Sequence, residues 1–347
     1  MGREEQRISE QSWQVGSLWG RQMRRRDFIK VVGGVTAALP LATQAQQAKP
    51  VIGFLSAVSP GPFAQRVAAF HQGLKESGYE DGRNLTIESR WAEERYDRLP
   101  ALAADLVGRG VEVLVTYTDA AALAAKKATT TIPIVFINGG DPVRAGIVAS
   151  LGRPGGNVTG ASFFGVDLAP KELSLLHDIV PKATVIGFLV DQNVPDAVGQ
   201  VPGMQETARR LGLQLVVLQV RTTSDIDAAF DTFVRERVGA LVVGTGALLT
   251  NRRKQIIALA ARHALPAIYP FREFAVDGGL ISYGNNVPDT FHQGGVYAGR
   301  ILKGDKPANL PVILSTKYEM VLNLKTAKAL GLVLSPVMLN TADDVIE

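Results

Sequence analysis

The stretch TIPIVFINGGDPVRAGIVASLGRPGGNVTGAS, residues 131–162, decides how the rest of the chain is interpreted. It opens with the apolar, β-branched run IPIVFI, which predicts a buried strand ending at Asn138 before two glycines. Asp141 and Pro142 suit the cap and the first position of a short helix, which the segment 152–157 then breaks. Because α/β proteins bind ligands where strands end at helix N-termini, we expect the cleft here, and the glycine/proline break suggests the hinge.

The composition indicates a globular protein of about two domains. The chain has 347 residues, of which 46% are hydrophobic and 20% are charged. It has no cysteine, which excludes disulfides, thiolate catalysis and cysteine-based metal sites. The four histidines are scattered, and neither a phosphate-binding loop, a dinucleotide fingerprint nor a nucleophile elbow occurs. We therefore expect no metal, no cofactor and no enzymatic activity.

The N-terminal region has the features of an export signal. Residues 24–45 read RRRDFIKVVGGVTAALPLATQA, a basic head followed by a short apolar run and small residues. The pair Arg25 and Arg26 resembles the twin-arginine export signal. We expect cleavage after Ala45 and a periplasmic product, and Met23 is an alternative to Met1 as the start.

Removal of this signal changes the charge of the protein. Residues 1–45 hold 7 of the 37 basic and 4 of the 33 acidic residues, so the remainder is near +1. The whole-chain pI of 9.2 is therefore no evidence for nucleic-acid binding. The chain after Ala45 has no unbroken apolar run of transmembrane length. We expect a monomer that binds no nucleic acid and has no transmembrane segment in its mature form.

An internal repeat indicates two similar lobes. The pentapeptide VIGFL occurs at residues 51–55 and again at 185–189. Three further pairs of apolar segments follow in the same order at similar offsets. Helical patterns alternate with these strands, which predicts an α/β fold with parallel sheets covered on both faces. One of these helices is predicted at residues 224–235, with Ser224 as its cap.

The tail after the second copy has no counterpart in the repeat, so we expect it to complete both lobes. This predicts several hinge crossings, near residues 158–161, near Asn285 and before Tyr318, with pivots at Gly155-Gly156 and Gly284. The expected division, after an N-terminal extension of residues 1–45, is residues 50–158 plus 286–314 in lobe 1 and residues 159–285 plus 315–347 in lobe 2.

Polar residues recur just past the predicted strands and are our candidates for ligand binding. Hydroxyls, amides and helix N-termini suit a carboxylate, and an acidic side chain suits an ammonium, for which we favour Asp191. Thr118 and Asp141 are alternatively plain helix caps. Arg272 with Glu273 also follows a predicted strand of the second lobe and is alternatively a surface pair. The candidates are Ser56, Tyr117, Thr118, Asn138 and Asp141 in the first lobe, and Asp191, Asn193, Thr245, Tyr283 and Asn285 in the second.

Three phrases in the chain resemble a known family. They are IPIVFINGGDPVRAGIVASLGRPGGNVTG at residues 132–160, ALPAIYPFREFAVDGGLISYG at 264–284 and YEMVLNLKTAKALGL at 318–332. They are similar to ABC-transporter substrate-binding proteins related to the tryptophan- and tyrosine-binding ones, which have the type I periplasmic binding protein fold. The resemblance implies two Rossmann-like lobes joined by a multi-strand hinge, with a small molecule, which could be an amino acid, between them. It also implies a membrane permease and an ATPase as partners.

Two other classes of protein are compatible with such lobes. A ligand-sensing receptor module would share the fold, and a repressor of this kind would need a helix-turn-helix before residue 51, where the export signal lies. An enzyme would need a paired nucleophile and base, which the spacing of residues does not reveal.

Overall fold

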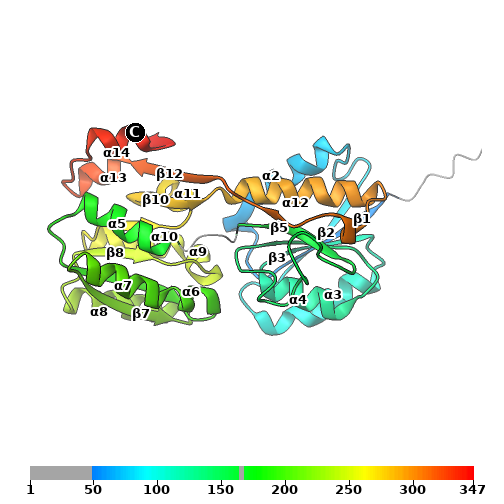
Figure 1. Ribbon diagram of the computed structural model, residues 1–347, viewed down its shortest axis with the longest axis horizontal. Coiled ribbons are helices and arrows are strands. Elements are labelled where there is room, and N and C mark those ends of the chain that lie inside the picture. The colour runs from blue at the N-terminus through cyan, green and yellow to red at the C-terminus, as the bar shows by residue number, and fades with distance from the viewer. Residues whose placement is uncertain (1–48, 164–167) are drawn as a thin grey trace, which may run out of the picture. The chain divides into compact units, whose positions relative to one another are not determined.

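The structure is a computed structural model that describes residues 49–163 and 168–347. The predicted export signal lies outside these residues. Two β-sheets form the centres of two lobes, and each sheet has helices on both faces (Figure 1). The predicted α/β fold with two lobes is therefore confirmed. No helix within the described ranges is long and apolar enough to cross a membrane.

The first lobe contains a six-stranded, all-parallel sheet in the order β11-β5-β4-β3-β1-β2. Three of its inner strands, β1, β3 and β4, are almost wholly apolar because helices cover both faces, and every residue of β3 is buried. The strands are β1 (Val51–Ser56), β2 (Thr86–Trp91), β3 (Val113–Tyr117), β4 (Ile134–Asn138), β5 (Val158–Ser162) and β11 (Ile313–Leu314). The helices are α2 (Ala64–Glu76), α3 (Leu99–Gly108), α4 (Asp119–Ala128) and α12 (Val287–Leu302), with single turns η1 (Gly61–Phe63), η2 (Tyr96–Arg98) and η3 (Pro307–Asn309).

The second lobe contains a seven-stranded sheet in the order β13-β12-β10-β9-β8-β6-β7, in which only the β10–β12 pair is antiparallel. The strands are β6 (Val185–Asp191), β7 (Gln214–Val220), β8 (Ala240–Val243), β9 (Ala267–Tyr269), β10 (Ile281–Asn285), β12 (Tyr318–Asn323) and β13 (Asp344–Ile346). The helices are α5 (Ala169–Ile179), α6 (Pro195–Gly199), α7 (Val201–Arg210), α8 (Thr223–Arg235), α9 (Ala247–Asn251), α10 (Arg253–Arg262), α11 (Arg272–Val276), α13 (Leu324–Ala329) and α14 (Pro336–Thr341).

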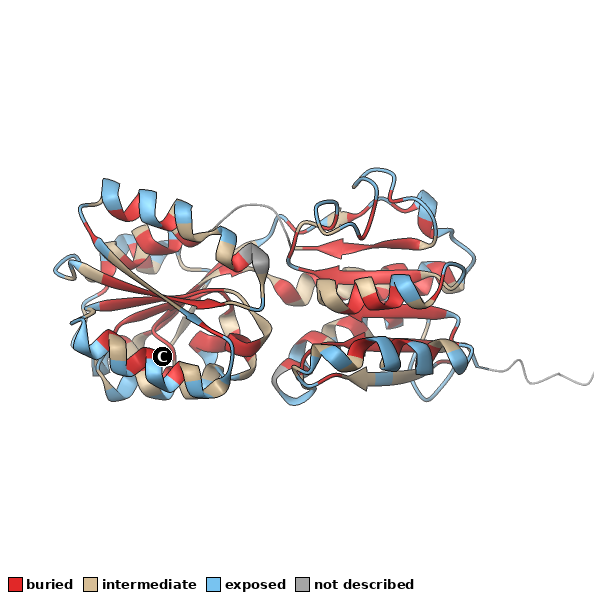
Figure 2. Ribbon diagram, turned by 90° about the horizontal axis from the view of Figure 1, so that it is seen from below, coloured by how far each residue is buried: buried red, intermediate tan, exposed pale blue. Residues whose placement is uncertain are grey.

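The internal repeat corresponds to equivalent strands of the two sheets. The order β2-β1-β3-β4-β5 in the first lobe matches β7-β6-β8-β9-β10 in the second, and both VIGFL copies are inner strands. The shared glycine has a packing reason. A Cβ on Gly53 would lie 2.9 Å from the Leu114 side chain, and one on Gly187 would lie 2.8 Å from Phe233. The inner strands are buried along most of their length, whereas the covering helices are buried on one side only (Figure 2).

The chain passes between the two sheets three times, after β5, after β10 and after β11. Helix α12 follows β10 of the second sheet but packs against α2 and against β3, β4 and β5 of the first lobe (Figure 1). The whole of β5 pairs with β4, which moves the first boundary of the expected layout from residue 158 to Ser162. Gly155 and Gly156 form a turn before β5, so they do not connect the lobes.

Two local predictions were wrong. The carboxylate of Asp141 does accept from the backbone N–H groups of Val143 and Arg144, as a helix cap would, but no helix follows, because the turn ends at Gly146, where φ is 72°. Helix α8 is capped by Thr222 and not by Ser224. The Thr222 side chain accepts from the N–H of Asp225, whose carboxylate binds back to the N–H of Thr222.

Candidate functional site

The predicted residues of the first lobe gather at one edge of its sheet. Ser56, Tyr117 and Asn138 are the last residues of β1, β3 and β4, and Thr118 caps α4. Parallel strands bring their carboxyl ends together, so these side chains share the edge where helices begin. Asn138 is fully buried, and its Nδ2 donates to the carbonyl of Gly140 at 3.0 Å and to the carboxylate of Asp119.

The predicted residues of the second lobe divide into two groups. Asp191 ends β6, and Thr245 follows β8 at the same edge of the sheet. Tyr283 instead lies within β10 and packs against the apolar cluster that α5, α7 and the C-terminal helices form. Burial of Tyr283 raises the pKa of its phenol. Asn285 is half-buried at the end of β10, where the chain leaves for α12.

Asp191 has a structural function in its own lobe. Its Oδ1 accepts from the backbone N and Nδ2 of Asn193 at 3.0 and 3.1 Å, and its Oδ2 accepts from the N–H of Leu248 at 3.1 Å. The last bond satisfies an N–H group at the start of α9. The carboxylate can come this close because residue 246 is glycine, where a Cβ would clash with it. Burial raises the pKa of Asp191, and these hydrogen bonds offset only part of that effect.

A fully buried arginine links the two lobes. Arg66 lies on α2 of the first lobe and is 1% exposed, and Glu273 lies on α11 of the second lobe and is 7% exposed. Arg66 donates from Nε to Oε1 of Glu273 at 2.7 Å and from Nη1 to the hydroxyl of Tyr117 at 2.8 Å. The rings of Phe63 and Phe271 have their centres 4.8 and 4.7 Å from the guanidinium carbon. The pair therefore lies between aromatic rings from both lobes.

The electrostatics of this pair favour the ionised state of both partners. Burial opposes ionisation of Glu273, but Arg66 outweighs it and holds the pKa of the carboxyl below its usual value. Burial likewise acts to lower the pKa of Arg66, whereas Tyr117 and Glu273 raise it above its usual value. Burial also raises the pKa of Tyr117, which remains a neutral acceptor for Arg66.

A second contact between the lobes lies on Glu94, just after β2. Glu94 accepts from Nδ2 of Asn251 and lies 3.8 Å from Nη2 of Arg252. The neighbouring Tyr96 has its pKa raised by burial and by the charge of Asp191 in the second lobe. The segment after β2 in the first lobe thus contacts the end of α9 in the second lobe.

Comparisons with known proteins show the family of the chain. A family model described as ABC transporter substrate binding protein matches residues 51–346. The chain belongs to this family. It is 28% identical to the tyrosine-binding protein of Clostridioides difficile over 264 residues, which are 76% of this chain and 75% of that protein. The chain is therefore a substrate-binding protein and not an enzyme.

Solved structures of similar sequence have the same fold. A protein from Streptococcus pneumonia in complex with L-Trp is 26% identical, with a TM-score of 0.77, over 86% of this chain and 100% of that chain. A conserved domain protein from Vibrio cholerae is 25% identical, with a TM-score of 0.78, over 86% of this chain and 99% of that chain. Together with the two sheets, these likenesses confirm the fold of a type I periplasmic binding protein for this substrate-binding protein.

The central ion pair of the substrate-binding protein was not predicted from its sequence. Arg272 and Glu273 follow a predicted strand of the second lobe, where the sequence allows either a binding role or a surface pair, but Glu273 binds Arg66, and Arg272 instead binds Glu319 and Asp344, each at 2.8 Å. A signal was present in α2. Arg66 is four residues before the buried Phe70, so a cation lies on the apolar face of the helix.

The remaining predicted residues have local roles in the described part of the protein. The Asp141 carboxylate shapes the turn after β4, and Asn193 also donates from Nδ2 to the carbonyl of Arg221 at 3.2 Å. Ser56 accepts from the N–H of Val58 at 3.3 Å, and Thr245 is half-buried. No cluster of histidine, aspartate and glutamate within residues 49–163 and 168–347 could hold a metal ion.

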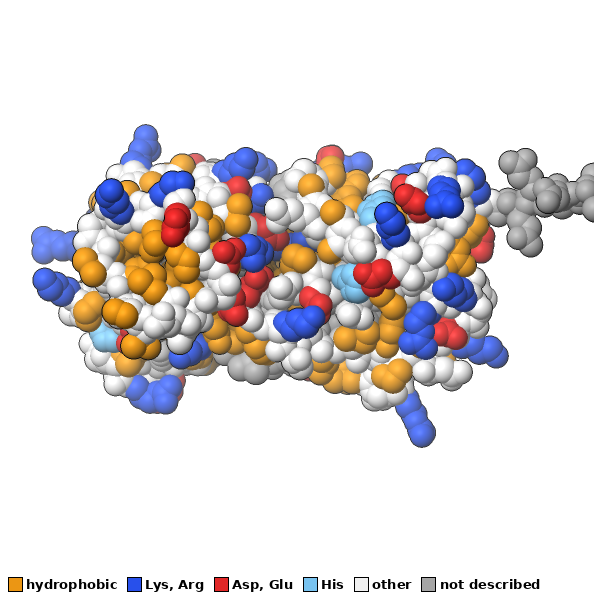
Figure 3. Space-filling view, turned by 90° about the horizontal axis from the view of Figure 1, so that it is seen from above, with side chains coloured by type: hydrophobic (Ala, Val, Ile, Leu, Met, Phe, Trp, Pro, Cys, Tyr) orange, Lys and Arg blue, Asp and Glu red, His pale blue; other side chains and the backbone are white. Residues whose placement is uncertain are grey.

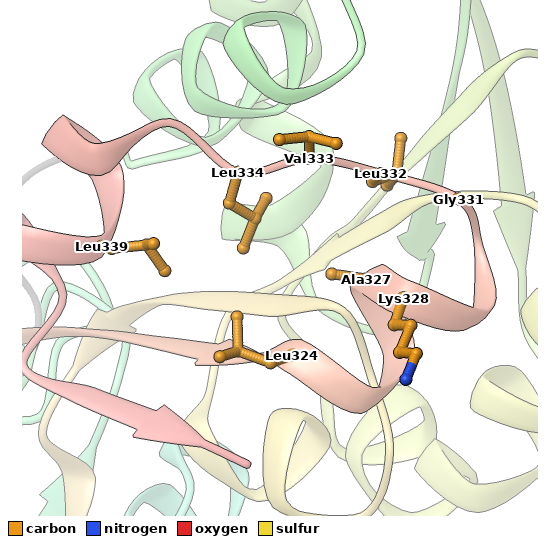
Figure 4. A pocket seen from close by; sticks show the side chains of 8 residues that line it. All are labelled: Leu324, Ala327, Lys328, Gly331, Leu332, Val333, Leu334 and Leu339. Atoms are coloured by element: carbon orange, nitrogen blue, oxygen red, sulfur yellow. The ribbon is translucent and has the colours of Figure 1, made fainter.

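An apolar hollow of about 340 Å³ lies elsewhere, on the C-terminal helices of the second lobe. Figure 3 shows hydrophobic side chains gathered over α13, α14 and the segment that joins them. Val333 in that segment and Val337 on α14 are 94% and 72% exposed. Leu324, Leu334 and Leu339 point into the hollow, whereas the side chain of Lys328 points away from it (Figure 4). None of the predicted site residues lines it.

The backbone of Thr118 is strained. Its φ of 90° and ψ of 153° fall in a region that glycine occupies almost alone, and such strain costs about 1–3 kcal/mol. Thr118→Gly should therefore raise the free energy of unfolding by about 1 kcal/mol, since a glycine cap costs only a few tenths. Urea unfolding measures this. Thr222→Gly is the matched control, because Thr222 caps α8 with φ −130°, and it should be destabilising. Equal losses of unfolding free energy in Thr118→Gly and Thr222→Gly would contradict strain at Thr118.

The low pKa of Glu273 predicts how stability depends on pH. Ionised Glu273 should contribute stability above its unfolded pKa of about 4.5, and this contribution is lost as the pH falls through the lower folded pKa. The difference between the unfolding midpoints of wild type and Glu273→Gln should be constant near neutral pH and shrink below about pH 4.5. Glu319 should show the opposite dependence of stability on pH, because burial raises the pKa of its carboxyl despite the neighbouring Arg272. A difference that does not change with pH would contradict this prediction.

Proposed function

We propose that this substrate-binding protein is the solute-binding component of an ABC importer and that its solute is an amino acid with an aromatic side chain. The observation that carries the proposal is the Arg66–Glu273 pair, which is buried between the lobes and lies among aromatic rings. Aromatic faces suit an aromatic side chain, and charged groups suit the ends of an amino acid. The tyrosine-binding relative and the L-Trp complex support this choice of ligand.

The lobes close around the ligand in this proposal. Contacts from both lobes exist together only in the closed form, so a ligand favours closure by its differential affinity for that form. Thr118 and Asn138 from the first lobe and Asp191 and Tyr283 from the second remain proposed binding residues. The connections after Ser162, Asn285 and Leu314 form the proposed hinge.

A ligand panel tests the proposal. Calorimetry with L-tryptophan, L-tyrosine and L-phenylalanine should give saturable binding, and L-leucine and D-allose should bind at least tenfold more weakly. Small-angle scattering of the protein should show compaction on saturation. Binding of the sugar in preference to all three aromatic amino acids would refute the proposed ligand class.

Export is the second part of the proposed function. A substrate-binding protein meets its solute outside the cytoplasm and delivers it to a permease whose ATPase drives import. N-terminal sequencing of periplasmic material should begin at Gln46, after cleavage following Ala45. Replacement of both Arg25 and Arg26 by lysine should abolish export by the twin-arginine route. Unchanged export of that variant would exclude the route.

A further inference from the structure

The guanidinium of Arg66 is fully buried, and one of its nitrogens has no hydrogen-bond acceptor among the described residues. Its Nε and Nη1 donate to Glu273 and Tyr117, but none of the described residues accepts from Nη2. A buried donor without an acceptor is costly, and a guanidinium is best satisfied by two oxygens of one carboxylate. Arg66 is therefore suited to donate to a second carboxylate, either beside that of Glu273 or in its place.

The two charges have the arrangement that an α-amino acid requires. Arg66 offers a cation from the first lobe, and Glu273 offers an anion from the second. The carboxylate of Asp191 is less suited to an ammonium, because it already accepts from three N–H groups of its own lobe. An amino acid carries both opposite charges on neighbouring groups, so it can replace the direct contact without leaving either protein charge unpaired.

Aromatic rings surround the pair. Phe63 and Phe271 lie against the guanidinium, and the ring of Tyr117 has its centre 5.5 Å from that of Phe63 and 4.8 Å from that of Phe291. Offset and edge-to-face contacts at such separations are the preferred contacts between aromatic groups. A flat ligand side chain can extend these contacts while its charged end remains at the ion pair.

We propose that the ligand separates the Arg66–Glu273 pair, with its carboxylate accepting from Arg66 and its ammonium donating to Glu273. This inference rests on the proposed function and adds the groups that recognise the two ends of the amino acid. A ligand that lacks either charge leaves one buried protein charge without a partner. Amines and carboxylic acids of the same shape are therefore rejected, as are uncharged sugars.

Truncated ligands test this on the wild-type protein. Calorimetry compares L-tyrosine with tyramine, which lacks the carboxylate, and with 3-(4-hydroxyphenyl)propanoate, which lacks the ammonium. L-Tryptophan, tryptamine and indole-3-propanoate form a second series. Each truncated compound should bind on the order of thirtyfold more weakly than its amino acid, or worse, which is the lower end of the cost of an unpaired buried charge.

Variants then assign each end of the ligand to one residue. Arg66→Gln should weaken the binding of the amino acid by on the order of thirtyfold but should not weaken that of tyramine and tryptamine, because their ammonium still pairs with Glu273 and no buried cation is left unpaired. Glu273→Gln should likewise weaken the binding of the amino acid but not that of the two propanoates, whose carboxylate still pairs with Arg66. Arg300→Gln is the control, because Arg300 is half-exposed in an ion pair with Asp305 on the first lobe, and its affinities should stay within twofold of wild type. Circular dichroism confirms that each variant is folded.

The outcomes separate this inference from the proposed function. If wild type binds L-tyrosine or L-tryptophan but rejects neither truncated compound, the inference is overturned and the function stands. The same holds if a complex crystallised with the amino acid keeps Arg66 and Glu273 in direct contact. If wild type binds no aromatic amino acid, the proposed ligand class is wrong and the inference fails with it.

Discussion

Arg66→Ala should lower the free energy of unfolding by about 3–5 kcal/mol, because it leaves the carboxylate of Glu273 buried without its cation. The substitution also removes the guanidinium from between Phe63 and Phe271. Urea unfolding followed by circular dichroism at neutral pH measures the loss. Arg300→Ala is the matched control, since its pair with Asp305 is half-exposed and should contribute no more than about 1 kcal/mol.

A double replacement separates the cost of an unpaired charge from the cost of lost packing. Arg66→Met combined with Glu273→Leu removes both charges and keeps apolar volume in the same place. It should recover most of the stability that Arg66→Ala loses, because buried ion pairs are often no more stabilising than well-packed apolar groups. A loss below about 1 kcal/mol for Arg66→Ala alone would show that the pair is not buried in the protein in solution.

Gly295→Ala should lower the free energy of unfolding by a similar amount, because the new methyl group clashes with a neighbouring helix. Helices α2 and α12 are so close that a Cβ on Gly295 would lie 2.2 Å from the carbonyl oxygen of Phe70 and 2.9 Å from the backbone N of Leu74. A Cβ on Gly73 would likewise lie 2.0 Å from the carbonyl oxygen of His292. Backbone atoms cannot rotate away, so the helices must separate. The expected loss is about 3 kcal/mol, the upper part of the usual range for overpacking.

The control for this substitution is Gly108→Ala at the end of α3. A Cβ there meets no atom within 4 Å, and the backbone has no positive φ, so alanine should leave stability unchanged or raise it by up to about 1 kcal/mol. Thermal unfolding of the two variants beside wild type provides the comparison. Equal unfolding temperatures for Gly295→Ala and wild type would mean that α12 does not pack on α2, and with it the proposed layout of the first lobe would fail.

Much of the fold follows from local patterns in the sequence. The apolar runs that became β1, β3, β4 and β6 are buried on both faces, and such burial requires uninterrupted apolar residues. The repeat of VIGFL identified equivalent inner strands. Each copy is covered on both faces, and in each the glycine lies where a Cβ would clash with a neighbouring side chain. The strand ends of the first lobe also identified Tyr117 and Asn138 correctly as residues of one sheet edge.

The tertiary structure alone decided which groups meet between the lobes. Arg66 and Glu273 are 207 residues apart, and neither α2 nor α11 contains information about the other helix. The sequence placed Glu273 beside Arg272, but α11 directs the two side chains to different partners, one to the first lobe and the other to β12 and β13. Local sequence determines strands and helices because their hydrogen bonds are local or repetitive. The partner of a buried charge depends on how three chain crossings bring the two lobes together, which no short segment specifies.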